Sequence, residues 1–314
     1  MSRAVVATAF GGPEVLAVID VEDGTPASGQ VAVDVLATGV NPIDVKVYSG
    51  TFGRGAPLPM RIGNEAAGVV SAVGVGAVGP RGPVAVGDEV IVYRAPGAYA
   101  DRLVVDAGAV VPKPTEMSFA AASGLMLTGA TAVHALTAAG VAAGTTLLLH
   151  GAAGGVGQMA VQIAVSRGAR VIATASPSRH DIIRALGGEP VTYGDGLIDR
   201  VRALAPDGVN AVVDAVGTDE ALDVSLALVD DRSRIATIVA TPRSFASGIK
   251  VLGGSPGADA GEVIRREARL QLVDLVAAGR LVVAVANSYP LARAADAHRE
   301  ILGGHTAGKI VLVP

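Results

Sequence analysis

An apolar run that ends in a burst of small residues constrains this chain more than any other feature. Residues 147–165 read LLLHGAAGGVGQMAVQIAV, and this succession predicts a buried strand, a tight turn and a helix. The turn fits the spacing G-x-G-x-x-G, with Ala152, Gly154 and Gly157 in the three small positions. The first small residue permits the turn, the second lets the backbone approach a pyrophosphate, and the third lets helix and strand pack closely.

The helix that follows this turn indicates which kind of ligand the turn binds. Its first N–H groups have no partner within the helix, and its positive dipole end favours phosphate. We therefore expect Gly154, Gly155, Val156 and Gly157 to hold the pyrophosphate of a dinucleotide. The alternative is a tight turn without a ligand.

The pattern of expected strands and helices in the 314-residue chain changes near residue 118, and this change favours two domains. Before it, strands are expected at 30–41, 66–74, 88–93 and 101–106. After it, with Ser118 as a helix N-cap, strands and helices alternate. Strands are expected at 145–150, 170–175, 210–215, 234–239 and 249–252, and helices at 155–167, 179–186, 219–229 and 260–278. This alternation predicts an α/β fold with a doubly wound parallel sheet, whereas the tail is a loop and a strand that could return to the first module.

The second strand of the alternating half indicates which dinucleotide binds. An NAD site usually carries an acid there for the ribose 2′-hydroxyl, but residues 174–178 contain none. Ser176, Ser178 and Arg179 are present instead, and hydroxyls with a guanidinium suit a 2′-phosphate. NADPH is therefore favoured over NADH. The alternative for Arg179 is an exposed residue in the first turn of a helix.

Composition excludes several classes of protein. The chain has no cysteine, so disulfides and thiolate zinc sites are impossible. A net charge of −4 provides no basic face for nucleic acid or membrane. The N-terminus does not read as a signal peptide, and no uncharged apolar run is long enough to cross a bilayer. A cytoplasmic protein without nucleic-acid or membrane partners is expected.

Five segments carry a resemblance to a known family: VNPIDVKVYSG at 40–50, LTGATAVHAL at 127–136, the glycine turn, GVNAVVDAVG at 208–217 and GKIVLVP at 308–314. The chain resembles the zinc-independent, zeta-crystallin-like quinone oxidoreductases, which are medium-chain dehydrogenases/reductases. The resemblance implies a GroES-like catalytic domain at 1–117 and 287–314 around a Rossmann NADPH-binding domain at 118–286. It also implies a homodimer paired through the Rossmann sheet edge, with GIKVLGGS at 248–255 as the pairing strand.

The resemblance also assigns cofactor residues. It implies that Ser176 and Arg179 bind the 2′-phosphate and that Tyr193 packs beside the adenosine. The residues implied near the nicotinamide and its ribose are Asn41, Thr128, Val216, Gly217, Ile238, Val239, Ala240 and Lys309. Each has an ordinary alternative: Tyr193 as a strand-end aromatic, Thr128 as a helix hydroxyl bonded to its own backbone, and Lys309 as a solvated lysine.

Zinc-dependent relatives place metal ligands where this chain has Asn41 and Asn64. Without a Lewis acid, alcohol oxidation is disfavoured, and hydride transfer from NADPH to a quinone is favoured. Two alternatives stay open: an alkenal or enone double-bond reductase, and an NADPH-binding sensor or structural protein with little turnover.

Residues 41–52 supply the catalytic candidates Asn41, Lys46 and Tyr48. Lys46 and Phe52 stand where many relatives read Tyr, and Tyr48 lies between them on a segment expected to be strand-like. Lys46 is alternatively an exposed structural lysine. No histidine suggests a metal: His134 and His150 are expected to be buried and hydrogen-bonded, and His298 and His305 to lie at the surface.

Overall fold

The computed structural model describes residues 1–304 and 306–314, which divide into two compact units. The first comprises Met1–Leu127, Arg269–Ala278 and Val283–Pro314, and the second comprises Thr128–Ala268 and Gly279–Val282. Residues 118–127, which the sequence analysis assigns to the second domain, thus cluster with the first unit. The domain boundaries given above stay a prediction, because compactness alone does not define a functional domain.

Antiparallel strands form the body of the first unit, as the alternating sequence predicts. The strand β3 (Gln30–Val40) buries nearly every second side chain at its centre and most residues at its end. One sheet has the order β2 (Leu16–Val21), β1 (Ser2–Ala7), β4 (Met60–Arg61). The larger sheet has the order β10 (Val110–Pro112), β8 (Glu89–Tyr93), β5 (Glu65–Val73), β3 (Gln30–Val40), β18 (Lys309–Val313), β17 (Val285–Pro290), and β9 (Arg102–Asp106) also pairs with β3. A small hairpin joins β6 (Val78–Gly79) to β7 (Gly82–Pro83).

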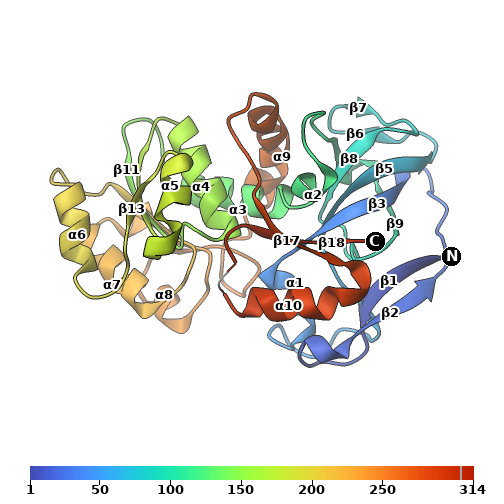
Figure 1. Ribbon diagram of the computed structural model, residues 1–314, viewed down its shortest axis with the longest axis horizontal. Helices are drawn as coiled ribbons and strands as arrows, with labels where there is room; N and C mark the ends of the chain where they lie inside the picture. The colour runs from blue at the N-terminus through green and yellow to red at the C-terminus, as the bar shows by residue number, and fades with distance from the viewer. Residues whose placement is uncertain (305) are drawn as a thin grey trace. The chain divides into compact units, whose positions relative to one another are not determined.

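The last strand of the chain returns to this sheet, as predicted. β18 runs antiparallel to β3, with Ile310 opposite Val40 and Leu312 opposite Thr38. On its other side it runs parallel to β17, and Figure 1 shows these two strands in red beside the blue β3. The pairing brings the end of the chain next to residues near position 40.

Helices of the first unit include α1 (Pro42–Tyr48), α2 (Phe119–Ala122) and α10 (Ala294–Leu302). The expectation that residues 42–48 are strand-like is wrong. Proline is favoured in the first turn of a helix, and the Asp44 carboxylate accepts a hydrogen bond from the Asn41 backbone N–H, so the segment coils. Ser118 caps α2, as predicted, by accepting a hydrogen bond from the Ala121 N–H.

The second unit contains a parallel sheet. Its order is β13 (Glu189–Val191), β12 (Arg170–Thr174), β11 (Thr146–His150), β14 (Ala211–Asp214), β15 (Ile235–Thr237), β16 (Lys250–Val251). Its helices are α4 (Gly155–Ser166), α5 (His180–Ala185), α6 (Leu197–Leu204), α7 (Asp219–Leu228) and α8 (Pro242–Ala246), whereas α3 (Met126–Ala138) and α9 (Glu262–Ala277) have residues in both units. The predicted doubly wound sheet is confirmed, and β16 lies at its edge.

Short 3₁₀ segments complete the described elements: η1 (Pro13–Val15), η2 (Ala107–Ala109), η3 (Pro177–Arg179), η4 (Arg232–Arg234) and η5 (Leu291–Arg293). A search of the described residues finds no helix with the length and apolar character needed to span a bilayer.

The turn after β11 is packed as its small residues predict. A Cβ on Gly157 would lie 2.6 Å from the Cα of Ala152 and closer still to the Gly151 carbonyl oxygen. A Cβ on Gly154 would meet nothing nearer than the Gly151 oxygen at 3.6 Å. Gly157 is therefore required by the fold, whereas Gly154 leaves open space in front of the turn.

This contrast predicts different stabilities for two alanine variants. Gly157→Ala is expected to lower the free energy of unfolding by about 1–3 kcal/mol, because the new methyl group overlaps backbone. Gly154→Ala is the matched control and is expected to stay within about 0.5 kcal/mol of the wild type. Denaturant unfolding of the three proteins measures both effects, and equal loss in both variants would contradict this account of the turn.

Candidate active site

The strand order of the second unit reverses between β11 and β14. Ligands of doubly wound sheets bind outside the carboxyl ends of the strands at such a reversal. The glycine turn follows β11, and Val216 follows β14. A Cβ on Gly151 would lie 3.2 Å from the Cβ of Val216, so these two loops lie side by side at the expected place.

The loops after β14 and β15 are tied together by a buried carboxylate. One oxygen of Asp214 accepts hydrogen bonds from the Val216 and Gly217 N–H groups at 2.9 Å each. Its other oxygen accepts from the Thr237 hydroxyl at 2.8 Å. Gly217 has φ +74°, and a Cβ at this position would lie 2.4 Å from the Val239 side chain. These two loops present the predicted nicotinamide-lining residues Val216, Gly217, Ile238, Val239 and Ala240, none of which is fully buried.

The first turn of α4 has the form expected of a phosphate site. Gly154 is the N-cap with extended backbone (φ −74°, ψ 171°), and Gly154, Gly155 and Val156 are partly exposed. Gly157 is buried against the turn itself. The leading N–H groups of the helix are thus available at a surface that carries no side chain larger than valine.

Polar residues follow β12, where the 2′-phosphate is expected. Ser176 and Arg179 are partly exposed and Ser178 is exposed. The hydroxyls of Ser176 and Ser178 lie 3.2 Å apart. These side chains stand on the short η3 segment and its N-cap, so the structure gathers the three predicted residues within four positions of one loop.

Tyr193 lies after β13 on a loop held by Arg200. The Tyr193 side chain is 53% exposed. The Arg200 guanidinium donates hydrogen bonds to the carbonyl oxygens of Thr192 (2.9 Å), Gly194 (2.9 Å) and Asp195 (2.7 Å). Three hydrogen bonds from one guanidinium therefore hold the loop that carries Tyr193.

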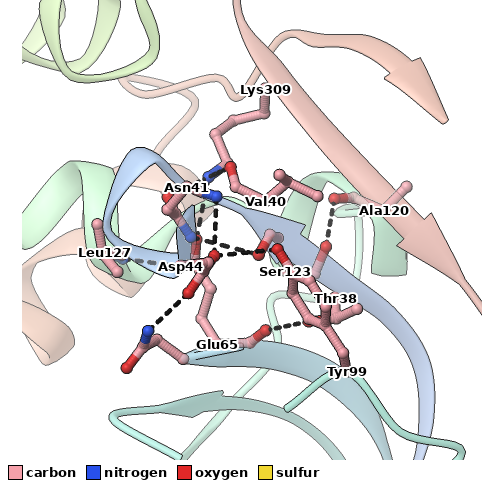
Figure 2. A network of polar contacts seen from close by, with 12 residues as sticks. Thr38, Val40, Asn41, Asp44, Glu65, Tyr99, Ala120, Ser123, Leu127 and Lys309 are labelled. Atoms are coloured by element: carbon pink, nitrogen blue, oxygen red, sulfur yellow. Dashed lines mark hydrogen bonds and ion pairs between the residues drawn. The ribbon is translucent and has the colours of Figure 1, made fainter. Parts of the chain in front are cut away.

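A buried ion pair in the first unit joins the predicted residue Lys309 to Glu65, and the predicted residue Asn41 is hydrogen-bonded to both, as Figure 2 shows. The Lys309 ammonium donates to a carboxylate oxygen of Glu65 (3.1 Å), to the side-chain oxygen of Asn41 (2.6 Å) and to the Val40 carbonyl (3.0 Å). Asn41 donates from its amide nitrogen to the same Glu65 oxygen at 2.9 Å. Asn41, Glu65 and Lys309 are at most 3% exposed, so the alternative of a solvated Lys309 is wrong.

The second Glu65 oxygen is also used, because it accepts from the Leu127 N–H at 2.8 Å. Sequence reasoning did not select Glu65. A signal existed in the sequence: Glu65 opens the otherwise apolar strand EAAGVV, and an acid there must find a cation or several donors.

A second set of buried polar side chains adjoins the first. Asp44 accepts from the Tyr99 hydroxyl (3.0 Å) and the Asn64 amide (2.6 Å). The Tyr99 oxygen also lies 3.0 Å from Nε2 of His298, whose Nδ1 lies 2.7 Å from the Tyr48 hydroxyl. Because Tyr99 donates to Asp44, His298 must donate from Nε2 to Tyr99 and accept at Nδ1 from Tyr48.

Burial controls the protonation of this set. It raises the pKa of Asp44 to about 6, against the opposing hydrogen bonds from Asn64, Tyr99 and the Asn41 backbone. It lowers the pKa of His298 to about 4 and raises the pKa of Tyr48 above its usual range. The expected surface position of His298 is wrong, because the tyrosines give its ring two partners inside the unit. Residue 305 lies outside the described residues.

The remaining candidates are placed separately. Lys46 is exposed on α1, and Phe52 is 47% exposed. Tyr48 is fully buried and bonded to His298, so its hydroxyl does not face solvent. Thr128, on α3, is 5% exposed. Of the catalytic candidates, the structure brings Asn41 and Tyr48 into adjoining buried clusters and leaves Lys46 apart.

His134 and His150 are buried, as predicted. His134 has Asp259 3.1 Å from Nε2, and it accepts at Nδ1 from Arg265 at 3.2 Å. The Nε2 atom of His150 has no hydrogen-bond partner among the described residues. Burial lowers the pKa of His150 to about 4, with Asp214 opposing the shift.

Comparison with known proteins identifies the family to which this chain belongs. A model of the alcohol dehydrogenase GroES-like domain matches residues 27–115, and a model named zinc-binding dehydrogenase matches residues 188–312. The mouse quinone oxidoreductase is 30% identical over 332 aligned positions, which cover 100% of this chain and 98% of that protein. The chain belongs to the quinone oxidoreductase family of medium-chain dehydrogenases/reductases.

Family membership makes the chain an enzyme of the oxidoreductase type, with a GroES-like domain and a Rossmann domain. A mycobacterial protein solved in complex with NADPH shares 31% identity and a TM-score of 0.84, with 100% of both chains covered. An erythronolide synthase of Saccharopolyspora erythraea is 34% identical over 308 positions, which span 93% of this chain and 8% of that protein. A segment similar to this chain is therefore also found within a much longer protein.

The protonation of His298 predicts a pH dependence of stability. The folded state keeps His298 neutral down to about pH 4, whereas in the unfolded chain the ring binds a proton near the ordinary histidine pKa of 6.5. Stability is thus unaffected above pH 6.5 and is lost as pH falls toward 4, by about 3 kcal/mol from this residue. His150 acts in the same direction, and the raised pKa of Asp44 acts in the opposite one.

The substitution His298→Gln removes only the part of the pH dependence of stability that comes from His298. Urea unfolding between pH 7 and pH 4.5 is expected to show a shallower fall in the variant than in the wild type. The slope, rather than the stability at neutral pH, is the test, because the substitution also alters hydrogen bonds. Parallel slopes for the two proteins would contradict a neutral buried His298.

Proposed function

We propose that this protein transfers hydride from NADPH to a quinone without zinc. The observation that carries the proposal is the small-residue turn at the strand-order reversal, in a chain that matches a quinone oxidoreductase over its whole length. NADPH supplies the hydride when bound, and the protein supplies position and a dry surface.

The second unit offers a fitting surface for each part of NADPH. The open space in front of Gly154 and the free N–H groups of α4 suit the pyrophosphate. Ser176 and Arg179 suit the 2′-phosphate, Tyr193 the adenosine, and the loops at 216–217 and 238–240 the nicotinamide. Asn41 and Lys309, which bond to Glu65 within the first unit, stay our candidates for contacts with the nicotinamide ribose or carboxamide.

The absence of zinc is proposed from the residue types. Asn41 and Asn64 are amides, the chain has no cysteine, and the described residues contain no group of three or more His, Asp or Glu that could hold a metal. Both asparagines instead bond to Asp44, whose two oxygens are occupied. A neutral amide site next to a lysine ammonium is a poor site for a divalent cation.

Arg179 provides the sharpest test of the cofactor. Arg179→Ala is expected to weaken NADPH binding by about 10- to 100-fold, because charge-assisted hydrogen bonds to a phosphate are lost. NADH, which lacks that phosphate, should bind both proteins alike. Calorimetric titration with each nucleotide measures the difference. Gly154→Ala is the matched comparison, since a methyl group in front of the turn should weaken both nucleotides.

A second candidate function is reduction of an activated double bond in an enone or alkenal. The similarity to a segment of an erythronolide synthase, which is not named for quinone reduction, favours testing it. A third alternative, an NADPH-binding sensor or structural protein with little turnover, is disfavoured because the chain belongs to a family of enzymes.

NADPH consumption with a panel of quinones and alkenals separates the three. Turnover of quinones, unchanged by a metal chelator, is the expected result. Turnover of alkenals alone would establish the second candidate, and tight NADPH binding without turnover would establish the third. Loss of activity with the chelator would contradict the zinc-free mechanism.

We also propose a homodimer paired through β16, which is supported by the edge position of that strand in the parallel sheet. The cytoplasmic location expected from the sequence stays a prediction.

A further inference from the structure

The contact between Asp44 and Asn64 joins a buried side chain of the first unit to a partly exposed one. The Asn64 side-chain nitrogen donates to one oxygen of Asp44 at 2.6 Å. Asp44 is 1% exposed, whereas Asn64 is partly exposed. The Asn64 side chain makes no other hydrogen bond among residues 1–304 and 306–314, so the contact with Asp44 alone sets the orientation of its amide.

The backbone of Asn64 is fixed, whereas its amide has two possible orientations. The Asn64 carbonyl accepts from the Ala95 N–H at 3.0 Å, and a Cβ on the preceding Gly63 (φ +101°) would lie 2.7 Å from the Tyr99 nitrogen. The oxygen and nitrogen of an asparagine side chain are nearly equal in size, so a half-turn of the amide exchanges a donor for an acceptor at the same place. An ionised Asp44 only accepts, and it therefore selects the orientation with nitrogen toward it.

The second oxygen of Asp44 has donors that do not depend on Asn64. It accepts from the Asn41 backbone N–H at 2.9 Å and from the Tyr99 hydroxyl at 3.0 Å. A proton on this oxygen would face two donors, whereas a proton on the oxygen next to Asn64 faces a single amide that can turn. Protonation of Asp44 is therefore favoured on the oxygen next to Asn64.

The surroundings of Asp44 bring its protonation into the range of weakly acidic pH. Burial raises the pKa of Asp44 to about 6, against the hydrogen bonds from Asn64, Tyr99 and the Asn41 backbone and the charge of Lys309. The folded protein thus takes up a proton at Asp44 as pH falls through about 6, well above the ordinary aspartate pKa of 3.8.

The other titratable groups around Asp44 keep their state in this range. Lys309, on β18, is paired with Glu65 on β5. Burial lowers the pKa of His298, on α10, to about 4, so its ring is neutral near pH 6. Burial also raises the pKa values of Tyr48 and Tyr99 above their usual range. A change near pH 6 within this cluster therefore belongs to Asp44.

We propose that Asp44 and Asn64 form a proton-operated switch, in which protonation of the Asp44 carboxylate turns the Asn64 amide by half a turn. A proton from solvent forms an O–H bond on the Asp44 oxygen next to Asn64, and the amide oxygen then accepts this O–H. The hydrogen bonds from Asn41 and Tyr99 to the other oxygen are kept, so each polar group of Asp44 stays paired in both states.

The switch changes what the first unit presents at Asn64. In the ionised state the amide directs its oxygen and one N–H away from Asp44, and in the protonated state it directs two N–H groups away. A partly exposed acceptor is thus exchanged for a donor. This inference does not depend on the proposed quinone reduction.

Side-chain NMR of the wild-type protein tests the switch without any substitution. The carboxyl carbon signal of Asp44 and the side-chain NH2 signals of Asn64 are expected to change together between pH 7.5 and pH 5, with one midpoint near pH 6. Asn287 is the internal control, because its amide also donates to a carboxylate, that of Glu300, at 2.6 Å. Burial opposes the shift at Glu300, but three side-chain hydrogen bonds hold its pKa below the usual value, so the Asn287 signals should not move in this range. Titration of Asp44 without a response of Asn64 would overturn the switch.

The variant Asp44→Asn imitates the protonated state. Its new NH2 group replaces the O–H as donor to Asn64, and its oxygen still accepts from Asn41 and Tyr99. The NH2 signals of Asn64 are therefore expected at the low-pH position of the wild type, and they should not change with pH. Asn64 signals that still titrate near pH 6 in this variant would show that another group turns the amide, and the role of Asp44 would be overturned.

The variant Asn64→Ala separates a turning amide from a fixed one. A fixed amide bonds only to the ionised carboxylate, so its removal would raise the pKa of Asp44 by about 1–2 units. A turning amide bonds to both forms, so we expect the pKa of Asp44 to stay within about half a unit of its wild-type value. Asn287→Ala is the matched control and should leave that pKa unchanged.

A rise of about one unit or more in Asn64→Ala would overturn the switch while quinone reduction stands. A wild-type protein that reduces no quinone would overturn only the proposed function, because none of these measurements uses turnover.

Discussion

The buried charge of Glu65 is the constraint on which the first unit depends. A carboxylate with no solvent exposure is tolerated only when it is paired and hydrogen-bonded. Lys309 supplies the charge, and Asn41 and the Leu127 N–H supply the remaining donors. Removal of one partner from such a pair costs about 3–5 kcal/mol, so the cluster must assemble as a whole. Lys309 opens the last strand of the chain, and its bonds fix that strand beside β3.

This pairing also determines what Asn41 can do. Its side-chain oxygen faces Lys309 and its nitrogen faces Glu65, so the amide orientation is set by two opposite charges. A side chain with both ends engaged is a rigid surface rather than a mobile donor. The side chains at the centre of the network are thus fixed by their hydrogen bonds, and the Asn64 amide is fixed at its edge by its bond to Asp44.

The sequence predicts those structural features that depend on residues close together in the chain. The glycine turn, the helix after it, the parallel strands and the Ser118 cap each follow from spacing within one segment. The strand-like reading of residues 42–48 was wrong because period-2 reasoning ignored Pro42 and Asp44, which favour a helix. The sequence predicts a surface position for His298, and only as an alternative for Lys309, because their partners are distant in the chain: Tyr99 lies 199 residues from His298, and Glu65 lies 244 residues from Lys309.

The same distinction separates the two halves of the candidate site. Binding of a dinucleotide depends on bare backbone at the end of one strand, and a short motif is sufficient to encode that. The buried polar network of the first unit instead joins side chains from residues near 41, 64, 99 and 309, which converge only when β3, β5 and β18 pair. Local sequence is therefore sufficient to predict the dinucleotide-binding turn, whereas the Glu65 network follows only from the pairing of strands that are distant in the chain.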